Sequence, residues 1–182
     1  MTTYDLVIRG GSVIDGTGSP AFAADVAVIG STIAEVGRVR ERGRVEIDAD
    51  GAVVAPGFVD IHGHYDGQAT WDSRMQPSSW HGVTTVLSGN CGVGFAPVRP
   101  RDRERLIELM EGVEDIPGVV LREGLDWSWE SFPEYLSKLE SRQLDLDVAA
   151  MIPHVPLRVF VMGERAIAKQ LAIESDIALM AQ

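Results

Sequence analysis

The sequence predicts an α/β fold in which a small β-rich region precedes a parallel sheet with helices between its strands. The first fifty or so residues hold β-rich runs about ten residues apart, with glycine turns between them. That spacing is typical of a small antiparallel sheet or sandwich. From Ala52 onward, buried strand patterns alternate with amphipathic helix patterns, as in chains whose strands pair in parallel.

In the β-rich region, short apolar or alternating runs are bounded by turn-forming residues. The pairs Gly10–Gly11, Gly30–Ser31 and Asp50–Gly51 are expected to turn the chain. The strands predicted from these runs cover residues 5–9, 12–14, 25–29, 32–36 and 44–47.

Beyond this region the predicted elements are longer and more buried. Residues 52–61 form an apolar run interrupted by Pro56–Gly57, and residues 82–88 are β-branched like a buried parallel strand. A third strand is expected over residues 147–152.

Two amphipathic helices are expected between the second and third of these strands, over residues 101–111 and 131–144. Ser131 is the expected N-cap of the latter, and Glu134 completes a capping box three residues later. A further helix is expected to begin at Ser175.

Composition excludes several classes of partner. The chain has 16 Lys and Arg against 27 Asp and Glu, a formal net charge of −11, so we expect neither nucleic acid nor an anionic membrane as partner. The N-terminus lacks the pattern of a signal peptide, and no stretch approaches the ~20 apolar residues of a membrane span. Cys91 is the single cysteine, so no intrachain disulfide can form. A cytoplasmic location is therefore expected.

The strongest chemical signal is Asp60-Ile61-His62-Gly63-His64, at the end of the first predicted parallel strand. Side chains two residues apart on a strand point to the same face, so His62 and His64 are expected to project together. Imidazole nitrogen suits zinc, and Asp60 on the same face is a candidate for orienting a ring. Taken alone, such a histidine pair is also compatible with no ligand role.

The second signal is Asn90-Cys91, which follows the second parallel strand between glycines. A metal ion would bind such a thiol as thiolate, whereas the alternative interpretation is a small buried apolar residue. The spacing of Gly89, Gly92 and Gly94 does not match a dinucleotide-binding fingerprint.

These motifs resemble a known family. The segments APGFVDIHGHYD (residues 55–66) and SGNCGVGFAP (88–97) are similar to the D-aminoacylase, or N-acyl-D-amino-acid deacylase, branch of the amidohydrolase superfamily. The histidine pair is specific for the superfamily, and Asn-Cys-Gly narrows the resemblance to this branch. It extends over nearly the whole chain and includes residues 4–37, 114–136 and 148–166.

The resemblance implies the N-terminal portion of a metal-dependent hydrolase with a (β/α)8 TIM barrel and a small β-sandwich built from both chain ends. A complete barrel usually needs roughly 250 residues, so the barrel is expected to be incomplete in this chain. Residues 1–54 would belong to the sandwich. Residues 55–182 would form the first three or so βα units, with an insertion at about 98–146.

The resemblance also implies the site and the reaction. His62, His64 and Cys91 would match zinc ligands, with one or two ions in the complete enzyme, and the reaction would remove the acyl group from N-acyl-D-amino acids. The general-base aspartate is expected beyond residue 182. Further candidates for contacts with the ligands or the small-molecule substrate are Asp60, Asp66, Asn90, His154 and Arg158.

The sequence leaves two alternatives open. One is a cyclic-amide hydrolase of the hydantoinase or dihydroorotase-like kind, against which Cys91 argues, because those enzymes generally use a lysine-bridged metal pair. The other is a non-catalytic truncated or scaffold protein. An incomplete barrel would expose sheet edges, so self-association is also expected.

Overall fold

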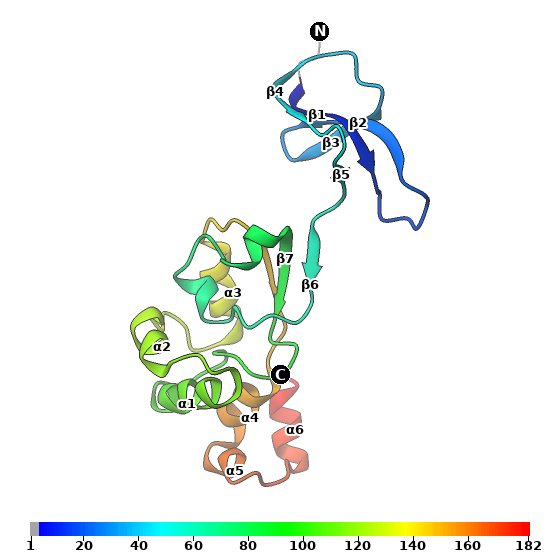
Figure 1. Cartoon of the computed structure of the whole chain (residues 1–182). Coiled ribbons are helices and arrows are strands. Elements are labelled where there is room, and N and C mark those ends of the chain that lie inside the picture. Colours follow the sequence, from blue (N-terminus) through cyan, green and yellow to red (C-terminus); the bar gives the residue numbers. More distant parts are fainter. Residues whose placement is uncertain (1–3) are drawn as a thin grey trace. The chain divides into compact units, whose positions relative to one another are not determined.

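The computed structural model describes residues 4–182, and the chain divides into two compact units at the bond between Pro56 and Gly57 (Figure 1). The first unit is a β-sheet, and the second combines a parallel sheet with helices.

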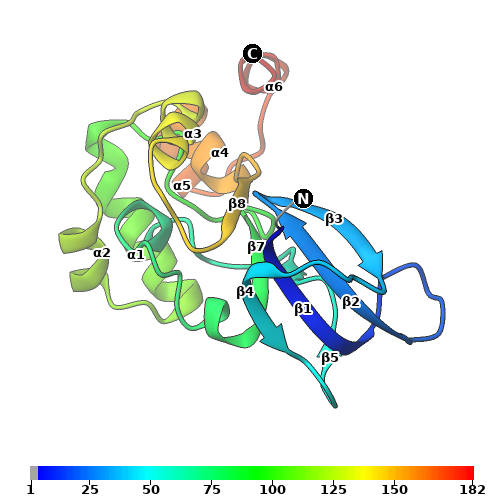
Figure 2. The same cartoon turned by 90° about the horizontal axis from the view of Figure 1, so that it is seen from above.

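The first unit is a five-stranded sheet in the order β3-β2-β1-β4, with β5 paired to β1 (Figure 2). The expectation was a small antiparallel sheet or sandwich. The observed sheet is mixed, because β1 is antiparallel to β2 but parallel to β4 and β5. Its strands are β1 (Tyr4–Val13), β2 (Phe22–Ile29), β3 (Thr32–Gly37), β4 (Gly43–Asp48) and β5 (Val53–Val54).

The strand β1 is continuous where two short strands and a turn were expected. Its pairing with β2 shifts register between Ile8 and Gly11, so the glycine pair forms a bulge instead of a turn. Gly10 has φ +68°, and its backbone N–H donates to Asp25 Oδ1 at 2.8 Å. This hydrogen bond between Gly10 and Asp25 keeps the strand continuous through the two glycines. The local sequence pattern does not reveal it, because Asp25 lies on another strand.

The second unit contains a three-stranded parallel sheet in the order β6-β7-β8. The apolar run at 52–61 is not one strand: β5 and β6 lie on opposite sides of Pro56–Gly57 and belong to different sheets. Proline has no N–H to donate to a ladder, and a Cβ at position 57 would lie 2.1 Å from Thr84 Cγ2. The strands are β6 (Phe58–Asp60), β7 (Val83–Ser88) and β8 (Asp147–Ala150).

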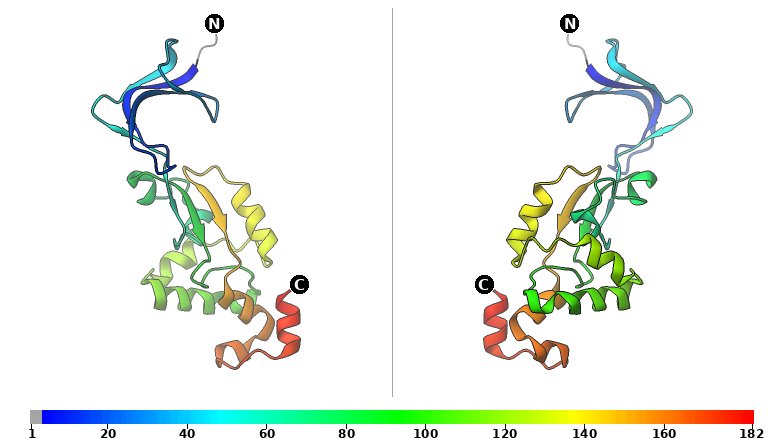
Figure 3. Two further views of the ribbon diagram at one scale, coloured as in Figure 1. Left: turned by 90° about the vertical axis from the view of Figure 1, so that its right-hand side faces the viewer. Right: turned by 90° about the vertical axis from the view of Figure 1, so that its left-hand side faces the viewer.

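Helices pack against this sheet, and Figure 3 shows α3 beside β8. The predicted capping box is confirmed: Ser131 Oγ accepts from the Glu134 backbone N–H, and Glu134 Oε2 accepts from the Ser131 N–H. The helices are η1 (Gln68–Thr70), η2 (Ser78–His81), η3 (Pro100–Asp102), α1 (Arg103–Glu114), α2 (Gly118–Gly124), α3 (Phe132–Glu140), α4 (His154–Met162), α5 (Glu164–Ile167) and α6 (Glu174–Met180).

Several boundaries differ from the prediction. Helix α1 runs to Glu114, beyond the expected end at residue 111, whereas α3 ends four residues short of 144. Helices α2, α4 and α5 were not predicted. Ser175 is not an N-cap: α6 begins at Glu174, and the Asp176 carboxylate accepts from the Ile173 N–H at 2.9 Å. Among helices built from residues 4–182, none is long and apolar enough to cross a membrane.

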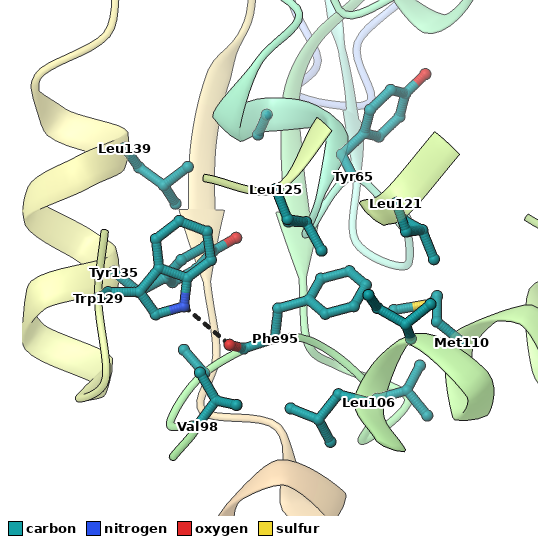
Figure 4. Packing of buried hydrophobic residues seen from close by; sticks show 14 of the residues in the cluster. Tyr65, Phe95, Val98, Leu106, Met110, Leu121, Leu125, Trp129, Tyr135 and Leu139 are labelled. Atoms are coloured by element: carbon teal, nitrogen blue, oxygen red, sulfur yellow. Dashed lines mark hydrogen bonds between the residues drawn. The ribbon is translucent and has the colours of Figure 1, made fainter. Parts of the chain in front are cut away.

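The core of the second unit gathers side chains from the long connection between β7 and β8 (Figure 4). Trp129 is 1% exposed, and its indole N–H donates to the Phe95 carbonyl at 2.9 Å. Phe95, Leu106, Met110 and Leu121 are equally buried. This packing fixes the connection, with α1 and α2, against the sheet.

The Trp129 bond predicts a clear effect on stability. We expect Trp129→Phe to lower the free energy of unfolding by about 2–4 kcal/mol, because it leaves a buried carbonyl without a donor and removes packed volume. Urea unfolding followed by circular dichroism measures the change. Trp80→Phe is the control, since Trp80 is 70% exposed, and its effect should stay within about 0.5 kcal/mol. Equal effects of the two substitutions would contradict the prediction.

Candidate metal centre

Two neighbouring parallel strands bring the candidate ligands together. Strand β6 ends at Asp60 and β7 at Ser88, with Asp60 opposite Val86 in the register. The segments that follow the two strands therefore leave the sheet at the same end, where the carboxyl ends of the parallel strands lie. There, ligand atoms of three residues lie within 4.8 Å of one another: those of His62, His64 and Cys91, called the ligand trio below.

The histidine pair lies just beyond β6, not on the strand as expected. The backbone N–H of Gly63 still donates to the Leu87 carbonyl at 3.3 Å, which holds this segment along the end of β7. The rings of His62 and His64 have centroids 5.6 Å apart and planes inclined by 54°. The two imidazoles therefore converge even though the strand has ended, because the backbone remains tied to its neighbour.

The Cys91 thiol is placed by a tight turn after β7. Gly89 has φ +84° and Gly92 φ +93°, and the Gly92 N–H donates to the Gly89 carbonyl at 3.0 Å. Asn90 Nδ2 donates to the Ile61 carbonyl at 2.9 Å, which links this turn to the histidine segment. Cys91 is exposed, contrary to a buried apolar role, and its Sγ lies 3.4 Å from His64 Nε2.

Two aspartates near the trio, Asp60 and Asp66, have different surroundings. The Asp60 carboxylate accepts from the backbone N–H of His62 at 3.1 Å; this bond is to the main chain and not to an imidazole ring. Asp66 is buried, and the described residues offer its Oδ2 no hydrogen-bond partner. Burial raises the pKa of the Asp66 carboxyl to about 7, and the charge of Glu114 acts in the same direction.

Glu114 is a neighbour of the trio that the sequence does not reveal. Its Oε1 lies 3.2 Å from His64 Nε2, and it is the last residue of α1. The helix was expected to end at residue 111, and helical periodicity does not indicate which distant loop a terminal side chain will meet. The cluster of acidic residues at the end of α1 would have been the only signal in the sequence.

His154 and Arg158 lie on α4, next to the turn that carries Cys91. The Val155 backbone N–H donates to the Gly92 carbonyl at 2.8 Å, whereas Arg158 Nη2 donates to the Gln170 carbonyl at 2.7 Å. Both side chains line a hollow of about 430 Å³ that Lys169 also borders. Neither belongs to the ligand trio.

The donors of the trio fit a zinc ion. Zinc prefers imidazole nitrogen and thiolate sulfur, which it binds at about 2.0–2.3 Å. Donor atoms within 4.8 Å of one another can reach one ion through small side-chain rotations. The exposure of His62 and Cys91 leaves room for such rotations.

A comparison with protein families shows which family this chain belongs to. The model of the amidohydrolase family matches residues 45–176, which include the whole trio. This chain belongs to the amidohydrolase family. The resemblance drawn from the His-x-His and Asn-Cys-Gly motifs is thereby confirmed.

Among curated relatives, this amidohydrolase chain is 33% identical over 178 residues to a D-aminoacylase of Alcaligenes xylosoxydans xylosoxydans, a match covering 97% of this chain and 34% of the relative. It is 34% identical over 164 residues to an N-acyl-D-glutamate deacylase of the same organism, covering 89% of this chain and 31% of the relative. The chain thus spans about a third of the length of these relatives.

Solved structures of the family give the same result. A crystal structure of D-aminoacylase superposes with a TM-score of 0.77 at 34% identity, covering 96% of this chain and 34% of that one. An N-acyl-D-glutamate deacylase from Bordetella bronchiseptica, solved with zinc and a phosphonate inhibitor, superposes with a TM-score of 0.74 at 30% identity, covering 98% and 35%. The predicted fold class, α/β and the N-terminal part of such an enzyme, is confirmed.

The turn that places Cys91 predicts a contrast between two glycines. A Cβ at Gly89 would lie 2.1 Å from the Met151 carbonyl oxygen, at a positive φ, so we expect Gly89→Ala to destabilise the fold by more than about 1 kcal/mol. Gly112 lies within α1 with open space around it, so Gly112→Ala should stabilise by about 0.5–1 kcal/mol. Thermal unfolding compares the two variants. If Gly89→Ala stabilised the fold as Gly112→Ala does, the turn at Gly89 would not require glycine.

Proposed function

We propose that this chain is the N-terminal part of a zinc-dependent hydrolase that removes the acyl group from N-acyl-D-amino acids. The convergence of His62, His64 and Cys91 carries the proposal, because a thiolate with two imidazoles is a donor set for zinc. The names of the relatives, D-aminoacylase and N-acyl-D-glutamate deacylase, support a linear amide of a D-amino acid as the substrate class.

Each residue near the trio has a proposed role. His62, His64 and Cys91 hold zinc, which when bound lowers the pKa of a water ligand to about 7 and polarises an amide carbonyl. The Asp60 carboxylate fixes the backbone of His62, and Asn90 holds the two loops together. The general-base aspartate and the remaining ligands lie outside residues 1–182 in this proposal.

The basic side chains on α4 are proposed to help recognise the substrate. N-acyl-D-amino acids carry a free carboxylate, and a guanidinium binds carboxylates well. Arg158 and His154 line the same hollow beside the Cys91 turn, which supports a role in carboxylate binding. Asp66, buried behind the histidine segment, is proposed to support that segment and not to contact substrate.

Metal content tests the ligand set directly. We expect the wild-type chain to bind zinc, and Cys91→Ser or His62→Ala to lower its affinity at least tenfold, because each removes one donor. Equilibrium dialysis followed by metal analysis measures the affinity. His81→Ala is the matched control, since His81 lies on η2 and outside the trio, and it should bind zinc like the wild type. Wild-type affinity in Cys91→Ser would contradict the ligand assignment.

Activity tests the reaction in the full-length protein that contains this chain. We expect hydrolysis of N-acetyl-D-amino acids, slower hydrolysis of the L-enantiomers, and a loss of kcat/KM of at least about 100-fold in His62→Ala. His81→Ala again serves as the control. Turnover of hydantoins in place of N-acyl-D-amino acids would favour a cyclic-amide hydrolase. Absence of turnover with either substrate class would favour a non-catalytic protein.

Two further expectations stay predictions. One is the cytoplasmic location. The other is self-association through the exposed edges of the β6-β7-β8 sheet, which light scattering on the chain would detect.

A further inference from the structure

The hollow lined by His154, Arg158 and Lys169 is larger than a carboxylate needs. Its lining residues come from α1, α4 and the end of α5, which lie close together in Figure 1. An ion pair of 2.6 Å between Arg105 of α1 and Glu164 of α5 joins two of these walls. The volume of about 430 Å³ falls within the range of about 300–1,000 Å³ that is typical of small-molecule sites. The function proposed above places only the substrate carboxylate there and leaves the substrate side chain unassigned.

Apolar side chains form most of the wall of this hollow. Val159 is 3% exposed, and Leu109 and Val155 are half-buried. A charged group placed against such side chains loses its hydration and gains no hydrogen-bond donor, whereas an apolar group is favoured there. The apolar lining residues are Leu109, Val155, Val159, Ala166 and Ile167.

The other three lining residues are all basic, in a chain whose formal net charge is −11. His154 and Lys169 are exposed, which places them at the mouth of the hollow. Arg158 keeps its charge available, because the carbonyl of Gln170 that accepts from its Nη2 is neutral. Among the described residues that line the hollow, none is acidic. The mouth therefore fits an anionic group.

Lys169 occupies a position that the local backbone would assign to another residue type. Its φ is +55°, and its N–H donates to the Ala166 carbonyl at 3.0 Å, just after α5. Glycine or asparagine is usual in this left-handed conformation after a helix. The end of α5 therefore does not explain why a cation stands here, whereas an anion at the mouth of the hollow does.

We propose that this hollow selects N-acyl-D-amino acids with an apolar side chain. The substrate side chain packs against Leu109, Val159 and Ile167, and the three basic residues bind the α-carboxylate. Substrates with an acidic side chain are disfavoured, because their second carboxylate would lie against the apolar wall. This inference rests on the proposed function and names the substrate class for it.

Ligand binding to the metal-free chain tests the hollow separately from catalysis. NMR spectra of the methyl-labelled chain are titrated with N-acetyl-D-leucine, N-acetyl-D-glutamate and N-acetyl-D-leucinamide. We expect N-acetyl-D-leucine to shift the methyl signals of Leu109, Val155 and Ile167. The other two compounds should bind at least about tenfold more weakly, because one brings a second charge and the other lacks the carboxylate. Equal affinity for N-acetyl-D-leucine and N-acetyl-D-glutamate overturns the proposal, and so does the absence of shifts at these methyl groups.

A matched pair of variants tests the apolar wall. Ile167→Lys places an ammonium group in the wall, so we expect it to reduce the preference for N-acetyl-D-leucine over N-acetyl-D-glutamate at least about tenfold. Ile177→Lys is the control: Ile177 is 58% exposed on α6 and does not line the hollow, so the wild-type preference should remain. Circular dichroism checks that both variants are folded. An unchanged preference in folded Ile167→Lys overturns the proposal, and the wild-type titration decides it if that variant does not fold.

Hydrolysis by the full-length protein that contains this chain separates the inference from the proposed function. We expect kcat/KM for N-acetyl-D-leucine to exceed that for N-acetyl-D-glutamate at least about tenfold. The opposite preference overturns the inference and leaves the proposed reaction standing. Hydrolysis of neither compound overturns the proposed reaction, and the methyl shifts of the metal-free chain then still support the hollow as a carboxylate site.

Discussion

The parallel pairing of β6 with β7 is the constraint on which the candidate site depends. Parallel strands end at the same edge of a sheet, so the chain after Asp60 and the chain after Ser88 meet although they are far apart in sequence. The close pairing requires glycine at position 57, where any side chain would collide with Thr84. An antiparallel arrangement would have placed His62 and Cys91 at opposite ends of the sheet.

The loops that follow β6 and β7 bring His62, His64 and Cys91 together. The Gly63 N–H bonds to the end of β7, and Asn90 bonds back to the Ile61 carbonyl, so each loop is held by the other. Behind them, the Trp129–Phe95 bond fixes the long connection between β7 and β8. Because that connection contains α1, the same core determines where Glu114 lies. The site is therefore shaped by packing well outside the trio itself.

Much of this could be predicted from the sequence, because the signals are local. β-branched residues indicate β7, a Ser and a Glu three residues apart indicate the start of α3, and the His-x-His and Asn-Cys-Gly motifs indicate the trio. The remainder depends on contacts between distant segments. The bulge at Gly10 needs the Asp25 carboxylate, and the approach of Glu114 to His64 needs the packing of α1 against the sheet. Neither contact leaves a periodic pattern.

Zinc binding by Cys91, His62 and His64 underlies the function proposed for this chain. X-ray absorption of the zinc-loaded chain tests it most directly, because sulfur and nitrogen ligands scatter at different distances. We expect one sulfur at about 2.3 Å together with nitrogen ligands at about 2.0–2.1 Å, and loss of the sulfur in Cys91→Ser. A shell of nitrogen and oxygen alone in the wild type would contradict it.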